Sequence, residues 1–133
     1  MDEGNYDMGL DEAYETVFLY EASVLGVFKE NNDKNATKRK FCSWFGANAF
    51  ICSKIWQHIL LLGPLQRGCV PKHLLWSLMY MKSYSHEHVI SLIVKADEKT
   101  VRKWKWYIID LVAKISDKVV SLIKYIIIHL IVE

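Results

Sequence analysis

The hydrophobic positions of this chain recur mostly every three or four residues, which is the spacing of an amphipathic α-helix. Residues 11–28 show this spacing after an acidic start that suits a helix N-terminus, at Val17, Phe18, Tyr20, Val24, Leu25 and Phe28. Residues 48–62 show it after Asn48, a predicted N-cap, at Phe50, Ile51, Ile55, Trp56, Ile59 and Leu60. Because no persuasive alternating pattern precedes residue 119, the sequence predicts an all-α, multi-helix protein.

Three more helices are predicted between residues 71 and 115. The first begins near Pro71, where a helix start tolerates proline, and ends at the "SYS" of residues 83–85. Its expected inward residues are Leu74, Leu75, Leu78 and either Met79 or Met81. Ser85 is the predicted cap of the second helix, which carries Val89, Leu92 and Ile93 on one face.

The third of these helices follows Asp97, a predicted N-cap, and runs to about Ile115. Its predicted core positions are Val101, Trp104, Ile108, Leu111, Val112 and Ile115. Three helices separated by breaks of about three residues are typical of a tri-helical helix-turn-helix, whose last helix enters the major groove of DNA.

The remaining segments divide the chain into an acidic N-terminal arm (1–33), a helical helix-turn-helix domain (34–118) and an apolar C-terminal tail (119–133). Residues 1–10 are expected to be frayed, 29–40 to form a polar linker and 63–71 to form a loop. A short helix is expected to end at Gly46.

The tail is expected to continue the preceding helix, although the β-branched run at residues 126–128 also fits a strand. Its 14-residue apolar run is interrupted by Lys124 and His129, and is short for a membrane span of about 20 residues. As a helix it would carry a broad apolar stripe at Val119, Leu122, Ile123, Ile126, Ile127 and Leu130. We expect this stripe to support self-association unless the N-terminal helix covers it.

Charge is distributed unevenly along the chain, although the formal net charge is only +2. Residues 1–33 hold nine acids and one lysine, a net charge of −8, whereas residues 34–133 hold 16 basic and six acidic residues, a net charge of +10. Such asymmetry points to nucleic-acid contact or to masking of the basic part by the acidic arm. The alternative interpretation is that the two segments simply form two differently solvated surfaces, without any function in nucleic-acid contact or masking.

The basic residues of the third helix are predicted to share a face. At about 100° per residue, Arg102, Lys103 and Trp106 lie at about 300°, 40° and 340° from Lys99, opposite Trp104. This face suits phosphate and base contacts. The expected DNA-binding residues are Lys95, Lys99, Thr100, Arg102, Lys103, Lys105 and Trp106, with Lys95 and Lys105 contacting the flanking backbone. A solvated helix face is the alternative interpretation.

Catalytic and metal chemistry have little support in the sequence. The three cysteines form no C-x-x-C pair, and the five histidines lack the short paired spacings of zinc sites, so we expect neither a metal nor a cofactor. The acidic start lacks the apolar core of a signal peptide, so reduced thiols in an intracellular protein are expected.

Several motifs nevertheless occur in a characteristic order. "FCSWFGANAFICSKIWQHI" is followed by "PKHLLWSLMYMKSYSHEHVISLIVKADEKTVRKWKWYIIDLVAKI". Over about residues 41–115, this arrangement resembles the segment that precedes the catalytic domain in Harbinger/PIF-like transposases of the DDE superfamily. The resemblance implies a nuclear, DNA-binding protein derived from a transposable element. It also implies that Asp97–Trp104 begins the recognition helix and that Trp76 and Trp104 are core residues.

The chain departs from the resembled family beyond this segment. The family continues into an RNase-H-like domain whose carboxylates bind two Mg²⁺ ions, and that domain is absent before Glu133, so we expect no enzyme. Asp97, Glu98, Asp110 and Asp117 are expected to serve as caps or solvated residues. Duplex DNA is the expected partner, and a helical protein-interaction or self-association module without nucleic-acid binding is the alternative.

Overall fold

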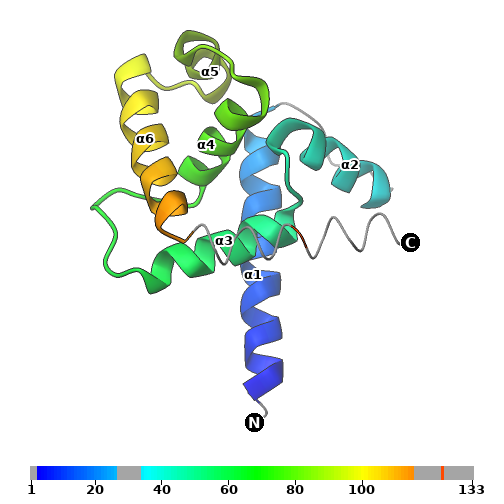
Figure 1. Cartoon of the computed structure of the whole chain (residues 1–133). Helices are drawn as coiled ribbons and strands as arrows, with labels where there is room; N and C mark the ends of the chain where they lie inside the picture. Colours follow the sequence, from blue (N-terminus) through cyan, green and yellow to red (C-terminus); the bar gives the residue numbers. More distant parts are fainter. Residues whose placement is uncertain (1–2, 27–33, 116–123, 125–133) are drawn as a thin grey trace.

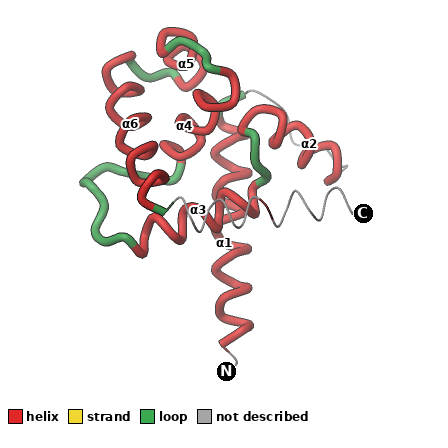
Figure 2. The backbone as a smooth tube through the Cα atoms, in the orientation of Figure 1, coloured by secondary structure: helices red, strands yellow, loops and turns green. Residues whose placement is uncertain are grey.

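The computed structural model describes residues 3–26, 34–115 and 124. Within those residues it consists of helices and loops, without a strand (Figure 2). The helices are α1 (Glu3–Val24), α2 (Lys34–Phe45), α3 (Ala49–Leu61), α4 (Lys72–Ser83), α5 (Glu87–Val94) and α6 (Glu98–Lys114). The prediction of an all-α protein is therefore confirmed for the described part of the chain.

Helix α4 lies in the middle of the arrangement (Figure 1). It packs against α5 and α6 on one side and against α2 on the other, and it also contacts α1. Helix α3 contacts α1, α2 and α6, with α1 as its most extensive neighbour. The N-terminal turns of α1 project beyond the other helices.

A hydrophobic cluster joins the helices within the described part of the chain. Its fully buried large side chains include Phe18, Phe41, Phe45, Ile59, Leu74, Leu75, Met79, Ile90, Val101 and Ile108. Burial of each such side chain stabilises the fold by about 1.5–3 kcal/mol. Trp76 and Trp104 are buried as well, in agreement with their expected place in the core.

Helix α1 is longer at its N-terminus than predicted. It begins at Glu3 rather than Asp11, so the expectation that residues 1–10 are frayed is wrong for residues 3–10. Two members of the predicted apolar stripe, Tyr20 and Val24, are 63% and 59% exposed. Phe18, another predicted member, is fully buried, and so is Ala22 one turn further on, which was not predicted, because both face α3 and the core.

Polar contacts also hold α1 against α3. The Asp11 carboxylate accepts hydrogen bonds from Lys54 Nζ at 2.8 Å and from Gln57 Nε2 at 2.6 Å. Partial burial raises the pKa of Asp11, but the bonds from Gln57 and Lys54 outweigh that effect and leave its pKa below the usual value. The aromatic edge contact of Phe18 with Trp56, at 6.5 Å between centroids, lies in the same interface.

Helix α2 overlaps the predicted linker. Residues 34–40 are helical, so the linker prediction is wrong for them, whereas residues 29–33 lie outside the described part. The inward positions of α2 are Thr37, Phe41 and Phe45, one helical turn apart. The sequence did not predict the first turns of this helix, because residues 34–40 are mostly polar and the first inward residue is a threonine.

Several predicted helix ends are confirmed. Asn48 Oδ1 accepts the Ile51 N–H at 2.8 Å, which caps α3. Gly46, with φ of 76°, follows the end of α2. The loop predicted at residues 63–71 separates α3 from α4, and Pro71 directly precedes α4.

The inward faces of α3 and α5 differ from prediction. In α3, Phe50 and Leu60 are each 39% exposed, whereas Cys52 and Ser53 are fully buried. In α5, Ile90 and Ser91 are buried, whereas the predicted positions Val89 and Leu92 are 42% and 66% exposed. Five of the eight residues of α5 are large and apolar, so its periodicity alone left the inward face ambiguous.

Ser85 does not cap α5. The N-cap position belongs to His86, which makes no side-chain capping bond. The Ser85 hydroxyl instead lies 2.6 Å from the Ser83 hydroxyl. The predictions for the apolar tail concern residues outside the described part, apart from the exposed Lys124.

Candidate nucleic-acid interface

Helices α4, α5 and α6 follow one another with three-residue connections at Tyr84–His86 and Lys95–Asp97. Each connection begins with a left-handed residue, Tyr84 with φ of 53° and Lys95 with φ of 58°. Both Lys95 and Ala96 donate backbone hydrogen bonds to the Ser91 carbonyl, which closes the end of α5. Since α6 packs against both α4 and α5, these turns fix where its N-terminus emerges.

The N-terminus of α6 is capped as the sequence predicted. Asp97 Oδ1 accepts the Thr100 N–H at 2.8 Å, and Asp97 Oδ2 accepts the Thr100 hydroxyl at 3.1 Å. The bond from the Thr100 backbone, supported by the one from its hydroxyl, lowers the pKa of Asp97. The hydroxyl expected to contact phosphate is therefore engaged in the cap, and Thr100 is only partly exposed.

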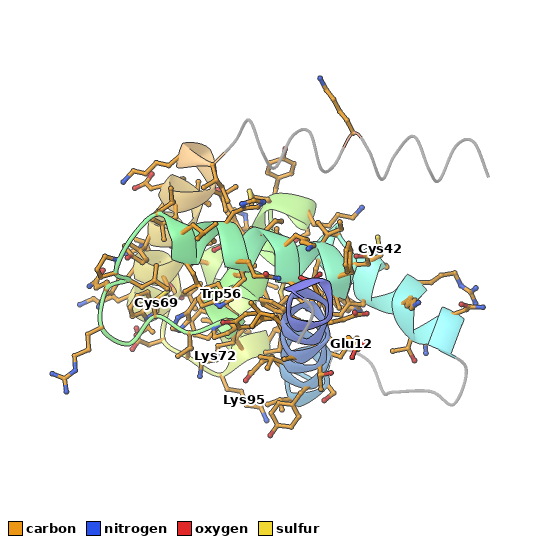
Figure 3. The ribbon with its side chains drawn as sticks, turned by 90° about the horizontal axis from the view of Figure 1, so that it is seen from below. Glu12, Cys42, Trp56, Cys69, Lys72 and Lys95 are labelled. Carbon is orange, nitrogen blue, oxygen red and sulfur yellow. The ribbon has the colours of Figure 1, made fainter. Side chains whose placement is uncertain are left out.

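Four of the seven predicted DNA-binding residues present exposed basic side chains around this helix start. Lys99, Arg102 and Lys103 are exposed, and together with Asp97, Glu98 and Thr100 they line a shallow surface depression. Lys95 is exposed at the preceding turn (Figure 3). The geometry therefore brings together basic groups from the turn and from the first two turns of α6.

Arg102 is held by a carboxylate of the neighbouring helix. Its Nε donates to Glu87 Oε2 at 2.9 Å, which joins α6 to the start of α5. The Arg102 side chain stays about half exposed. Because Nε alone carries this bond, the two terminal NH₂ groups retain donors for another acceptor.

The position of Lys105 corrects the set of DNA-binding residues predicted from the sequence. It is 2% exposed, with its Nζ 3.9 Å from the centroid of the Tyr80 ring, 4.6 Å from that of Trp106 and 3.5 Å from Glu87 Oε2. A buried ammonium in this position cannot reach the flanking DNA backbone, so we remove Lys105 from the candidate interface. The sequence contained the signal: Lys105 lies at about 240° from Lys99, on the same side of the helix as Ile108.

The two tryptophans of α6 lie on different faces of the helix, as predicted. Trp106 is 48% exposed and meets Tyr80 edge-on, at 6.1 Å between centroids. Trp104 is buried and stacks on His73 with an interplanar angle of 6° and a centroid distance of 4.5 Å. Lys103 Nζ lies 4.5 Å from the centroid of the Trp104 ring, so this lysine covers the tryptophan while remaining exposed.

His73, which the sequence reasoning did not single out, anchors α4 to α6. Its Nδ1 accepts the Val70 N–H at 3.2 Å, and its ring also meets Trp76 edge-on. Burial, with smaller contributions from the cations of Lys72 and Lys103, lowers the pKa of His73 to about 4. The ring is therefore neutral at physiological pH, which suits its stacking on Trp104.

The sequence also contained no indication that Glu87 is the partner of Arg102 and Lys105. No local pattern connects residues 87 and 102, since their contact depends on the angle between two helices. Glu98, one residue after the cap, pairs with His88 at 2.9 Å, and both side chains are largely exposed.

Among the described residues, no group of three or more His, Cys, Asp or Glu side chains could hold a metal ion. No helix in the part covered by the structure is long and apolar enough to cross a membrane. Comparisons of the chain with known proteins find no matching family model, no matching curated protein and no matching solved structure.

Proposed function

We propose that this protein is a non-catalytic DNA-binding domain of the helix-turn-helix type, derived from a Harbinger/PIF-like DDE transposase. Helices α4, α5 and α6 form the tri-helical unit, and α6 is the recognition helix in the major groove. One observation carries the proposal. Lys99, Arg102 and Lys103 are exposed together in the first two turns of α6, directly after a three-residue turn.

Each exposed side chain has a role that fits its chemistry. Lys99 and Lys103 bind phosphate oxygens as point charges, and Lys95 binds a phosphate beside the turn. Arg102 uses its terminal NH₂ groups on a phosphate or on a guanine edge, while Glu87 holds its Nε. Trp106 lies one turn further along the same face and packs against the sugar-phosphate backbone.

Exposed apolar side chains favour a second candidate function, that of a helical protein-interaction or self-association module. Leu60, Leu61 and Leu62 at the end of α3 are 39%, 77% and 43% exposed, and Leu92 of α5 is 66% exposed. Exposed apolar groups of this kind are common at protein interfaces. A clean monomer by light scattering, together with salt-dependent DNA binding, would exclude this candidate as the main function.

Charge removal tests the proposed DNA interface. The variant Lys99→Gln/Arg102→Gln/Lys103→Gln is titrated against a fluorescent random duplex of about 30 base pairs, and binding is followed by anisotropy. The control Arg67→Gln/Lys72→Gln/Lys114→Gln removes the same charge from exposed positions elsewhere. We expect the α6 variant to lose at least about tenfold in affinity and the control to change much less. Equal losses in the two variants would contradict a localised interface.

A further inference from the structure

Helix α2 carries a concentration of positive charge that the proposed α6 interface does not use. Residues 34–45 read "KNATKRKFCSWF", with Lys34, Lys38, Arg39 and Lys40 and no acidic residue. The side chains of Lys38, Arg39 and Lys40 are all exposed. We call these three residues the α2 basic surface.

The orientation of α2 explains their exposure. Thr37, Phe41 and Phe45 are 7%, 1% and 1% exposed, so one face of α2 is committed to the core. At about 100° per residue, Arg39 points almost directly away from that face, and the two lysines flank it. Figure 3 shows nitrogen-tipped side chains of α2 directed away from the other helices.

No carboxylate neutralises this surface within the described residues. The ion pairs found there join Lys54 to Asp11, His88 to Glu98, and both Arg102 and Lys105 to Glu87. On α6, by contrast, Arg102 is already paired and Lys103 lies over an aromatic ring. The α2 basic surface therefore presents to a polyanion three cations for which the described residues supply no carboxylate partner.

We infer that the α2 basic surface is a second phosphate-binding surface, which contacts the backbone of duplex DNA without reading its sequence. This inference rests on the proposed function of α6. Helices α2 and α6 pack on different sides of α4, so the two surfaces contact different stretches of backbone (Figure 1). Arg39, at the centre of the surface, suits bidentate contact with a phosphate group.

The structure favours a duplex over an anionic membrane as the partner. A helix that binds at a membrane surface inserts its apolar face between the lipids. In α2 the aromatic residues Phe41 and Phe45 of that face are already buried in the protein core. Outside that buried face, α2 exposes the three cations and a single large apolar side chain, Trp44, which is 37% exposed. One partly exposed tryptophan is little apolar surface for insertion into a membrane, whereas the cations suit the phosphates of a duplex, which are approached from outside.

The test removes the three charges from the full chain. The variant Lys38→Gln/Arg39→Gln/Lys40→Gln retains good helix formers on α2, so we expect its thermal midpoint and circular dichroism to match the unsubstituted protein. Its affinity for the random duplex should fall about tenfold at about 50 mM salt, and the slope of log affinity against log salt should become shallower by about 2–3. The scattered variant Arg67→Gln/Lys72→Gln/Lys114→Gln controls for net charge and should keep the original slope.

The outcomes separate this inference from the proposed function. If the unsubstituted protein binds DNA and the α2 variant binds with the same affinity and slope, the α2 inference is overturned and the α6 interface stands. If the unsubstituted protein does not bind DNA, the proposed function fails and this inference fails with it. If the α2 substitutions abolish binding to vesicles containing phosphatidylserine but leave duplex binding intact, the surface serves a membrane and the inference is overturned.

Discussion

The Nε of Arg102 donates a hydrogen bond to Oε2 of Glu87 at 2.9 Å, and the same oxygen lies 3.5 Å from the buried ammonium of Lys105. One carboxylate at the start of α5 therefore binds an exposed cation and a buried cation of α6. Tyr80 of α4 completes the contact by covering Lys105. This cluster ties together the three helices of the proposed DNA-binding unit.

Replacing Glu87 by Gln is expected to destabilise the fold by about 1–3 kcal/mol, because the buried Lys105 loses its carboxylate partner. Urea unfolding measures the free energy of unfolding. The control Glu98→Gln removes the carboxylate of an exposed pair with His88 and should change stability by less than about 1 kcal/mol.

A double variant distinguishes loss of the ion pair from a general effect of the Glu87 substitution. Lys105→Met removes the buried charge but retains much of the side-chain volume, so it should recover much of the stability lost in Glu87→Gln. Destabilisation equal to the sum of the two single variants would contradict a direct interaction between Glu87 and Lys105.

His73 is expected to make stability depend on pH. Its pKa is about 4 in the folded protein and has the usual value of 6.5 in the unfolded chain. Between those values the unfolded state binds more protons, so stability is full above about pH 6.5 and falls as pH decreases towards about 4. This effect of His73 lowers the free energy of unfolding by at most about 3 kcal/mol.

The variant His73→Phe retains an aromatic ring beside Trp104 but cannot protonate in this range. We expect it to be somewhat less stable at pH 7, because the Val70 N–H loses its acceptor, and to show a flatter stability profile between pH 4 and 6.5. Urea unfolding at several pH values provides the comparison. An unchanged pH slope in His73→Phe would show that other groups cause the dependence.

Helix α1 is expected to be necessary for folding, since Phe18 is fully buried in the shared core. Phe18→Ala should destabilise the protein by about 3–5 kcal/mol, measured by urea unfolding. Tyr20→Ala, at a position 63% exposed on the same helix, should have an effect within about 0.5 kcal/mol. Similar small effects in both variants would indicate that α1 is a detachable arm.

This role of α1 changes how masking by the acidic segment should be tested. Deleting residues 1–33 would remove Phe18 and Ala22 from the core. Neutralising an exposed acid of α1, as in Glu12→Gln, leaves those contacts in place (Figure 3). Tighter DNA binding by Glu12→Gln, with unchanged stability, would support masking.

Local sequence signals predicted the features that depend on one helix turn. Asn48 and Asp97 cap their helices because a side-chain oxygen three residues before a free N–H is sufficient for the bond. Trp104 and Trp106 were separated correctly because helical geometry assigns them to different faces.

Features that depend on the packing of several helices were not predicted. The eight residues of α5 are apolar on more than one side, and only the positions of α4 and α6 select Ile90 for burial. Lys105 was assigned to the surface on charge alone, although its angular position pointed inward. Its burial depends on Tyr80, Trp106 and Glu87, which come from three different helices.

The salt dependence of duplex binding tests the central claim most directly. If Lys99, Arg102 and Lys103 bind phosphates, log affinity should fall with log salt with a slope of about −2 or steeper between about 50 and 200 mM. Replacing all three by Gln should make that slope shallower by about 2–3. An affinity that does not change with salt, or a slope that survives these substitutions, would contradict the proposed α6 interface.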